Sequence, residues 1–510
     1  MQLLNILTMK IRLTNWVMNA HRVMGWVLCV FFLMWFLSGI VMLYQRFPRV
    51  YDNDRVEHLE AIGESYESLP SIEVLQTRVG NKPARSLQVE RYLGQTYFKW
   101  QASDSLYILS ADERQTLHSI KEYDYIDKVV KTWNKASISR VDTLYQLDQW
   151  TPFGSMKAEL PFYRYHFDDA EHHQLYVGSV TGRVLQYTTL SERFWAWLGA
   201  IPHWIYFYQL RQDVELWSDV VIYLSGAGCI MVILGLWLGI IRWRQHRKNH
   251  TSGVTPYKKK WHRWHHVLGL AFGIFALTFV FSGMMSMMPL PDWITHSHLQ
   301  GSPSRYMQAA APQPFDYLLD YRKVVEAYPE AQLLQWRHLR EHPYYVVTTP
   351  DDVYYVDAQD CELKPLNISR DEFLGYVKAF YQQDGSTMNR QIDLKVEELD
   401  HFETYYRARS VIENDMLLPV WKISADDVDK SVFYMNPRDG SVRYVDRSSR
   451  LNYWAYTALH RMRIGFLNSR PVLRKTLIWV LMLGGATLSG TGIVLGINRV
   501  RRLFRKKNKI

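Results

Sequence analysis

The chain has 510 residues, of which 48% are hydrophobic and 22% charged, with a formal net charge of +10 and three cysteines. Cys29 and Cys229 lie in long apolar runs and Cys361 stands alone in a polar stretch, so a disulfide framework and a cysteine-rich metal or cluster site are excluded. The positive charge is gathered in three short segments, which indicates membrane topology and contact with anionic lipid rather than binding of nucleic acid.

Four apolar runs are long enough to cross a bilayer, because a hydrocarbon core of about 30 Å needs roughly 20 helical residues. The first run is too long for a signal peptide and lacks a small-residue cleavage site, so it is predicted to be an uncleaved helix. The predicted spans are residues 23–44, 220–241, 267–288 and 476–497.

The distribution of charge predicts the orientation. Residues 1–22, 242–263 and 499–510 carry 18 of the 60 basic residues and no acidic residue, which leaves 42 basic against 50 acidic residues elsewhere. By the positive-inside rule these three segments are cytoplasmic. The chain is therefore predicted to be a multi-pass membrane protein, with both termini cytoplasmic and both large loops on the opposite side of the membrane.

Both large loops show the same succession of a short helix and strand-like pieces with alternating hydrophobicity. This pattern predicts four helix-and-meander units, two in each loop, and hence two α+β loop domains. Helices are expected at 71–79, 123–133, 316–328 and 370–381, and strands at 86–92, 95–101, 106–110, 162–167, 174–180, 183–187, 332–339, 344–348, 353–356, 421–423, 431–436 and 441–445.

Aromatic residues crowd the segments 194–208 and 453–466, which precede the second and fourth spans. Tryptophan and tyrosine at this density favour helices at the membrane–water interface. The predicted organisation is a cytoplasmic N-terminus with the first span (1–45), an outer loop domain (46–193), an interfacial helix with the second span (194–242), a basic cytoplasmic loop (243–262), the third span (263–289), a second outer loop domain (290–450), an interfacial helix with the fourth span (451–498) and a basic cytoplasmic tail (499–510).

Matching residues recur at fixed offsets along the chain, which predicts a tandem duplication of a helix–loop–helix unit. Parallel repeats of this kind place equivalent residues around a pseudo-twofold axis along the membrane normal. At an offset of 244, His21, Gly25, Ser38 and Gly39 recur as His265, Gly269, Ser282 and Gly283. At an offset of 257, Trp197, His203, Gly228, Gly235 and Gly239 recur as Trp454, His460, Gly485, Gly492 and Gly496.

Four histidines recur in this register, and a histidine in or near lipid is a functional hypothesis by default. Imidazole is the usual axial ligand of a b-type haem, and helix-bundle interiors hold such cofactors. His21 and His265 stand at the cytoplasmic ends of their helices, whereas His203 and His460 stand toward the outer side. Each pair could therefore clamp one haem, so the sequence predicts two haems b.

Alternatives remain open for each of these residues. His262 lies one turn below His265 on nearly the same helix face and is the rival ligand, while His266 points about 100° away. Interfacial anchoring is the structural alternative for the histidines, and small-residue helix packing is the alternative for the glycines. The loop pairs His172/His173 and His296/His298 are weaker metal-binding candidates.

The sequence lacks the motifs of several enzyme classes. The cytoplasmic segments are short, and neither a glycine-rich dinucleotide-binding motif nor a phosphate-binding loop occurs, so a nicotinamide or flavin domain is not expected. Electrons would then arrive from a membrane quinol or a separate protein. No arrangement typical of a serine peptidase or of a zinc peptidase is present.

Several short motifs occur along the chain. They are the helix openings His21-x-x-x-Gly25 and His265-x-x-x-Gly269, the Ser-Gly pairs near the far helix ends, Leu459-His460-Arg461, and the Tyr-x₅-Gly strands starting at Tyr176 and Tyr434. With these features the chain resembles, over nearly its whole length, the PepSY-associated transmembrane proteins. That family includes iron-regulated membrane proteins and ferric-siderophore reductases. The chain departs from the pattern at the second histidine, because His203 follows Pro202 and precedes Trp204 instead of lying between leucine and arginine.

The resemblance implies a protein of the bacterial inner (cytoplasmic) membrane, with both termini cytoplasmic and two periplasmic PepSY-like domains on a four-helix membrane unit. It implies a haem-dependent reductase whose periplasmic substrate is ferric iron in a siderophore, or another periplasmic oxidant. Two other functions fit the same sequence. The first is a non-catalytic PepSY protein that binds or regulates a periplasmic partner, with purely structural histidines. The second is a transporter, for which the expected inverted repeats and broken helices are not evident.

Overall fold

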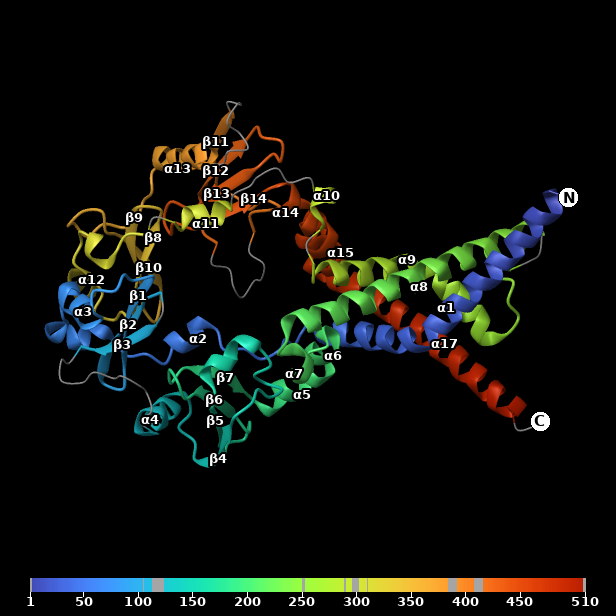
Figure 1. The fold of residues 1–510 in the computed structure, drawn as a ribbon, viewed down its shortest axis with the longest axis horizontal. Coiled ribbons are helices and arrows are strands. Elements are labelled where there is room, and N and C mark those ends of the chain that lie inside the picture. Colours follow the sequence, from blue (N-terminus) through green and yellow to red (C-terminus); the bar gives the residue numbers. More distant parts are fainter. Residues whose placement is uncertain are drawn as a thin grey trace.

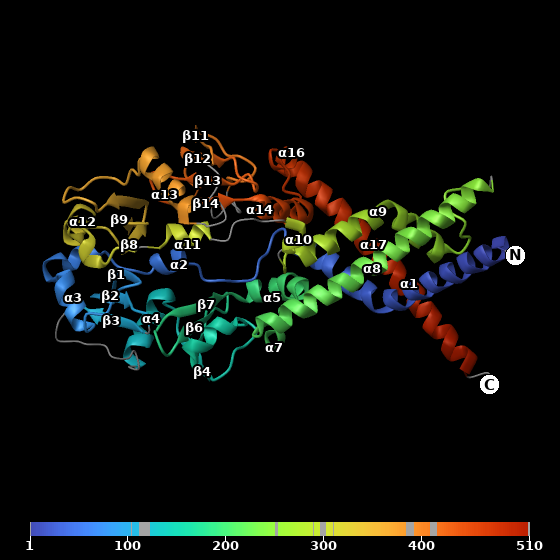
Figure 2. The same ribbon diagram turned by 45° about the horizontal axis from the view of Figure 1, so that its top comes forward.

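The computed structural model describes residues 2–507 except 104, 112–122, 250–252, 289, 296–301, 310, 384–391 and 408–415. The molecule is elongated, with a bundle of long helices at one end and β-sheets at the other (Figure 1 and Figure 2). Both chain ends lie at the end of the bundle that is farther from the sheets.

Four helices of the described chain are long and apolar enough to cross a membrane. They are α1 (Gln2–Val41), α8 (Val214–Lys248), α9 (Lys260–Met285) and α17 (Pro471–Lys507). Each contains most of one predicted span, which confirms the prediction of four membrane helices. They extend beyond the apolar runs at their basic ends, because helical hydrogen bonding continues where the side chains become polar.

In the core of the helix bundle, aromatic rings pack directly against glycines. A Cβ atom on Gly228 would lie 2.9 Å from the ring of Phe32, and one on Gly485 would lie 2.5 Å from the ring of Phe36. Both rings are 4% exposed. Small residues let membrane helices approach closely, so these two glycines set the spacing of α8 and α17 against α1.

The sheet farthest from the bundle combines strands of both loops. Its order is β10-β9-β8-β1-β2-β3, and β1 pairs with β8 in antiparallel register, with Val89 opposite Leu334. Both of these side chains are fully buried. The two loop domains expected to be separate therefore share one sheet. Its strands are β1 (Ser86–Tyr92), β2 (Gln95–Gln101), β3 (Leu106–Ser110), β8 (Leu333–Leu339), β9 (His342–Thr348) and β10 (Val353–Asp357).

Two four-stranded sheets lie between this distal sheet and the bundle (Figure 1). One contains β4 (Ile138–Leu144), β5 (Phe162–Phe167), β6 (Gln174–Gly178) and β7 (Val184–Thr188) in that order. The other contains β11 (Leu394–Leu399), β12 (Val420–Ala425), β13 (Val432–Met435) and β14 (Val442–Val445) in that order. The sequence pattern missed β4 and β11, because both are edge strands with largely polar or exposed side chains.

Helices precede the strands in both halves of the chain, as the sequence predicts. The α-helices of the loops are α2 (Asp52–Val56), α3 (Ile72–Arg78), α4 (Tyr123–Trp133), α10 (Asp292–Thr295), α11 (Pro303–Met307), α12 (Tyr321–Ala327) and α13 (Arg370–Gln383). Short helices then lead into the second and fourth spans: α5 (Leu190–Leu198), α6 (Ala200–Trp204), α7 (Tyr208–Arg211), α14 (Arg447–Asn452), a π-helix (Tyr453–Ala458), α15 (Leu459–Arg461) and α16 (Gly465–Asn468).

A buried ion triad joins the distal sheet to α13. The ring of His342, 2% exposed, lies 2.7 Å from Glu372 and 3.1 Å from Asp357. Burial alone would lower the pKa of His342, but hydrogen bonds to the two carboxylates raise it to about 9.

This triad predicts a stability that falls at high pH. Because the pKa of His342 is raised on folding, its contribution of about 3 kcal/mol is complete below pH 6.5 and is lost as the pH rises through 9. In thermal unfolding, we expect the wild type to lose more stability between pH 7 and pH 10 than His342→Gln does. Equal losses in both proteins would contradict this assignment.

Candidate cofactor sites in the helix bundle

The structure brings the four recurring histidines together in two pairs. His21 on α1 faces His265 on α9, with ring centres 6.3 Å apart and an angle of 45° between the rings. His203 on α6 faces His460 on α15, with ring centres 6.0 Å apart and an angle of 55°. We call these the inner pair and the outer pair; the inner pair lies toward the chain ends and the outer pair toward the sheets.

In the inner pair, the Nδ1 atoms are held by the two other membrane helices. Nδ1 of His21 lies 2.9 Å from the carbonyl oxygen of Met231 on α8. Nδ1 of His265 lies 2.9 Å from Oγ1 of Thr491 on α17, and this hydroxyl donates to the carbonyl of Leu488. Both acceptors favour the tautomer with the proton on Nδ1, so the lone pair of each ring is on Nε2.

In the outer pair, each Nδ1 atom contacts a serine hydroxyl and the backbone carbonyl of the residue one helical turn before that serine. Nδ1 of His203 lies 3.2 Å from both Oγ of Ser38 and the carbonyl of Trp35. Nδ1 of His460 lies 3.1 Å from Oγ of Ser282 and 3.2 Å from the carbonyl of Phe279. Within the described part of the chain, no hydrogen bond engages Nε2 of any of the four histidines.

The outer histidines are neutral at physiological pH. Burial lowers the pKa of His203 to about 4 and that of His460 to about 3. A neutral imidazole with its proton on Nδ1 presents the Nε2 lone pair, which is the form that binds a metal.

Each of the four imidazoles lies on a glycine. A Cβ atom on Gly235 would lie 2.6 Å from Cε1 of His21, and the corresponding distances are 3.5 Å for Gly492 and His265, 3.3 Å for Gly39 and His203, and 3.5 Å for Gly283 and His460. In sequence, Gly235 and Gly492 are 257 residues apart, and Gly39 and Gly283 are 244 apart. The glycines therefore leave room for the rings at both pairs.

The two outer histidines are also placed by the same unusual turn. Each lies two residues before a left-handed residue, Ile205 with φ +54° and Met462 with φ +50°. Non-glycine residues rarely adopt this conformation, and it is costlier for a β-branched residue such as isoleucine. The strain coincides with the short helices that carry His203 and His460, as is common at functional sites.

A cavity of about 620 Å³ surrounds the inner pair. This volume lies within the range of small-molecule and cofactor sites. Seven glycines line it, together with four arginines and no acidic residue: Gly25, Gly235, Gly239, Gly269, Gly273, Gly492 and Gly496, with Arg22, Arg242, Arg499 and Arg502. The lining of the cavity is thus largely apolar, and its charged groups are all positive, which suits a ligand with an apolar body and negative groups.

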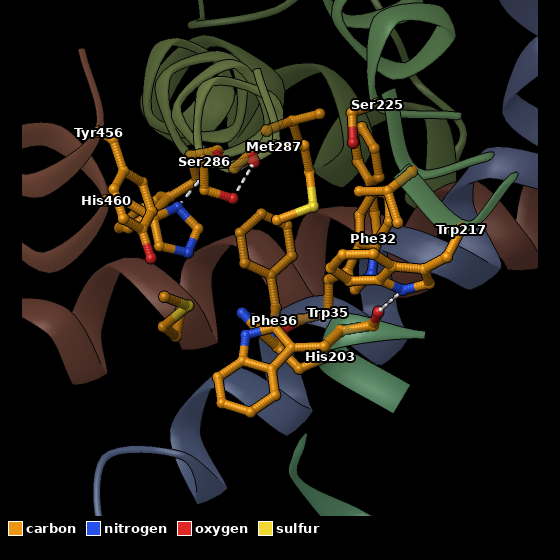
Figure 3. A pocket seen from close by; sticks show the side chains of 16 residues that line it. Phe32, Trp35, Phe36, His203, Trp217, Ser225, Ser286, Met287, Tyr456 and His460 are labelled. Carbon is orange, nitrogen blue, oxygen red and sulfur yellow. Dashed lines mark hydrogen bonds between the residues drawn. The ribbon is translucent and has the colours of Figure 1, made fainter. Parts of the chain in front are cut away.

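The outer pair lines a smaller cavity of about 80 Å³ (Figure 3). The side chains of Trp35, Phe36 and Met287 surround the two histidines in Figure 3. A large ligand at this pair would require such side chains to move. Phe32 lines both cavities and separates them.

The rival histidines of α9 face elsewhere. Nε2 of His266 lies 3.1 Å from the carbonyl of Gly239, and its ring is 5.3 Å from that of Tyr257. The ring of His262 is 6.1 Å from that of Tyr257. His265 is therefore the histidine of this helix end whose ring opposes His21.

The weaker loop candidates do not form a metal site among the described residues. His173 hydrogen-bonds to Asp169 at 2.7 Å and stacks on Tyr187, which gives it a structural role. His296 and His298 lie outside the described residues. Across the part of the chain that the structure describes, no three His, Cys, Asp or Glu residues are grouped as metal ligands.

The spacing within each pair suits a single metal atom between the rings. A metal–imidazole bond of about 2 Å on each side, plus roughly 1 Å from each nitrogen to its ring centre, gives ring centres about 6 Å apart. Two opposed imidazoles are too few donors for a bare metal ion, which takes four or more ligands. They could, however, hold a haem, because the macrocycle supplies the other ligands of its iron.

Some residues of the candidate sites could not be identified from the sequence. Thr491 and the carbonyl of Met231 reach their histidines across the bundle, and no sequence pattern links them. Ser38 and Ser282 were visible as recurring residues, but only the fold shows that they contact His203 and His460.

A comparison with protein-family models gives no match for this chain. No curated protein matches it in sequence.

Proposed function

We propose that this protein carries electrons across the bacterial inner membrane through two haems b and reduces a periplasmic substrate. The observation that supports this most is the pair geometry: two sets of opposed imidazoles about 6 Å apart, with every Nδ1 bound by the protein. His21 and His265 would hold the inner haem, and His203 and His460 the outer one. When bound, haem supplies reversible one-electron chemistry.

The residues around the inner pair fit the remaining parts of a haem. Seven glycines line the cavity around the imidazoles, and the four arginines would supply guanidinium groups for two propionates. At the outer pair, the fit rests on the four Nδ1 contacts, the ring spacing and the two glycines under the rings.

The direction of transfer follows from the proposed topology. An electron that leaves a negative cytoplasm gains about 2.3 kcal/mol per 100 mV of membrane potential. A membrane quinol or a separate protein would deliver electrons at the inner pair, and the outer pair would pass them to the substrate. The resemblance to PepSY-associated membrane proteins favours ferric iron in a siderophore as that substrate, which makes the protein a ferric-siderophore reductase.

The competing proposal is a non-catalytic PepSY protein that binds or regulates a periplasmic partner. The two proposals differ in a property that can be seen directly. A dihaem protein purifies red, whereas an accessory protein with structural histidines purifies colourless.

The proposed function is tested by mixing dithionite-reduced, desalted protein with a ferric trishydroxamate chelate under argon. We expect reoxidation of the haem absorption bands together with the appearance of ferrous iron, followed with a ferrous-specific dye. A red protein whose haems stay reduced in the presence of the chelate would exclude ferric reduction while leaving electron transfer to another oxidant.

Removing the serine contacts of the outer pair should weaken only the outer haem. Ser38→Ala and Ser282→Ala each delete one hydrogen bond to Nδ1 of an outer histidine. Loss of such a ligand-orienting partner costs about 10- to 100-fold in affinity, so the outer haem should be lost first on dialysis against apomyoglobin. Ser286→Ala is the matched control, because that hydroxyl lines the same cavity but donates its hydrogen bond to the carbonyl of Gly283 and not to Nδ1 of an outer histidine.

A further inference from the structure

The two histidines of the inner pair are held by different acceptors, although they occupy equivalent positions of the repeat. Nδ1 of His21 lies 2.9 Å from the carbonyl oxygen of Met231. Nδ1 of His265 also lies 2.9 Å from its acceptor, which is a hydroxyl, Oγ1 of Thr491. This hydroxyl donates to the carbonyl of Leu488 at 2.6 Å. Because a hydroxyl has one proton, Oγ1 can only accept the hydrogen bond from Nδ1 of His265.

The repeat shows what the hydroxyl replaces. Leu488 stands 257 residues after Met231, which is the offset between the second and fourth membrane helices, so the two carbonyls are equivalent. Thr491 stands 257 residues after Leu234, whose side chain has no hydrogen-bonding group. In the first half of the chain the imidazole therefore reaches the carbonyl directly. In the second half, a hydroxyl takes the hydrogen bond of the imidazole and passes it on to the equivalent carbonyl.

The outer pair does not share this difference. Nδ1 of His203 and Nδ1 of His460 each contact a serine hydroxyl, and each lies 3.2 Å from a backbone carbonyl. Within the described part of the chain, His265 is the one of the four recurring histidines whose Nδ1 is hydrogen-bonded to a hydroxyl and to no carbonyl. The asymmetry therefore belongs to the inner pair and arises at Thr491.

The acceptor of Nδ1 affects how strongly an imidazole binds iron through Nε2. An amide carbonyl belongs to a peptide group with a large dipole, and it attracts the Nδ1 proton more strongly than a neutral hydroxyl does. The imidazole with a carbonyl partner is therefore the more basic ligand, and a more basic ligand stabilises ferric over ferrous iron. Of the two inner rings, His265 is thus the weaker ligand.

We propose that Thr491 sets the redox potential of the inner haem, because its hydroxyl holds His265 more weakly than a carbonyl would. The proposal rests on the proposed function and deepens it at the inner pair. A milder reductant can then reduce the inner haem than if both imidazoles were hydrogen-bonded to carbonyls. Thr491 acts through His265 and is a positioning residue.

The test is a redox titration of the full-length purified protein, followed by its visible spectrum. The inner haem is identified as the couple that disappears in His21→Ala. Thr491→Val keeps the shape of the side chain and removes the hydroxyl, so the carbonyl of Leu488, which already acts on His265, is free to accept from Nδ1. We expect the equilibrium constant for reduction of the inner haem to fall about tenfold, which is about 59 mV for one electron. The potential of the outer haem should stay in place.

The matched control is Thr487→Val, the same replacement one turn earlier in α17. Oγ1 of Thr487 donates to backbone carbonyls of its own helix and contacts no histidine, so both potentials should stay in place. The reciprocal variant Leu234→Thr introduces a hydroxyl at the equivalent position beside His21 and should raise the inner potential. The double exchange L234T/T491L moves the hydroxyl from one histidine to the other and should restore an inner potential close to that of the wild type.

An inner potential that is unchanged or raised in Thr491→Val would overturn the proposal, because the hydroxyl would then not be the weaker partner of His265. Loss of the inner haem in this variant would also overturn it, because no carbonyl would then have replaced the hydroxyl. If an exchange variant fails to fold, the comparison of Thr491→Val with Thr487→Val still decides. A haem count on the same samples separates the two proposals. Red protein whose inner potential does not move contradicts only the role of Thr491, and colourless protein contradicts the proposed function.

Discussion

His21→Ala is expected to halve the haem content of the purified protein. The substitution removes one of the two imidazoles of the inner pair, and the outer pair, which lines a separate cavity, keeps both of its own. The measurement is a haem count per protein by the pyridine haemochrome method, together with a redox titration. One of two midpoint potentials should disappear, and the other should stay in place.

His262→Ala and His266→Ala are the controls for this result. Both residues lie within one turn of His265 and line the inner cavity, but their rings face Tyr257 and not His21. Both variants should keep the full haem content. If His262→Ala loses a haem and His265→Ala does not, the ligand assignment at this helix end is wrong.

Gly235→Ala is expected to release the inner haem without touching a ligand residue. The added methyl group would lie 2.6 Å from Cε1 of His21, which is closer than real contacts allow, and 3.1 Å from Nδ1, which is a tight contact. The ring must then leave the carbonyl of Met231, which fixes its orientation. We expect loss of the low-spin spectrum of one haem, and an inner haem that is lost at least about tenfold more readily to apomyoglobin.

Gly490→Ala is the matched control for the glycine variant. Gly490 also lies in a membrane helix, and no atom lies within 4 Å of the position of its added Cβ. Alanine favours a helix by about 1 kcal/mol over glycine, so this variant should keep both haems and be at least as stable as the wild type. Equal haem retention in the Gly235 and Gly490 variants would show that the space over Gly235 is not needed for His21.

Much of the membrane unit could be predicted from the sequence, because its signals are local. The four long apolar runs lie mostly within four helices that are long and apolar enough to cross a membrane. Helical periodicity separates His265 from His266 by the angle that directs only one of them at His21. The sequence also predicted the pairing of the histidines, since residues that recur at a fixed offset were expected at equal depth in the membrane. The structure places their rings 6.3 and 6.0 Å apart.

The parts that could not be predicted depend on contacts between distant segments. The pairing of β1 with β8 joins residues about 245 positions apart, and nothing in either strand specifies its partner. The strands β4 and β11 lack a clear alternation because they lie at sheet edges. The Thr491 contact and the arginines of the inner cavity appear only once four helices pack together.

The proposed function depends on two haems held by the four opposed histidines. The most direct test is an oxidised-minus-reduced visible spectrum of the purified wild type, combined with a haem-per-protein count and a redox titration. We expect b-type bands, about two haems per chain and two midpoint potentials. A colourless protein that takes up no added haemin would contradict it and would leave the periplasmic binding protein as the better explanation.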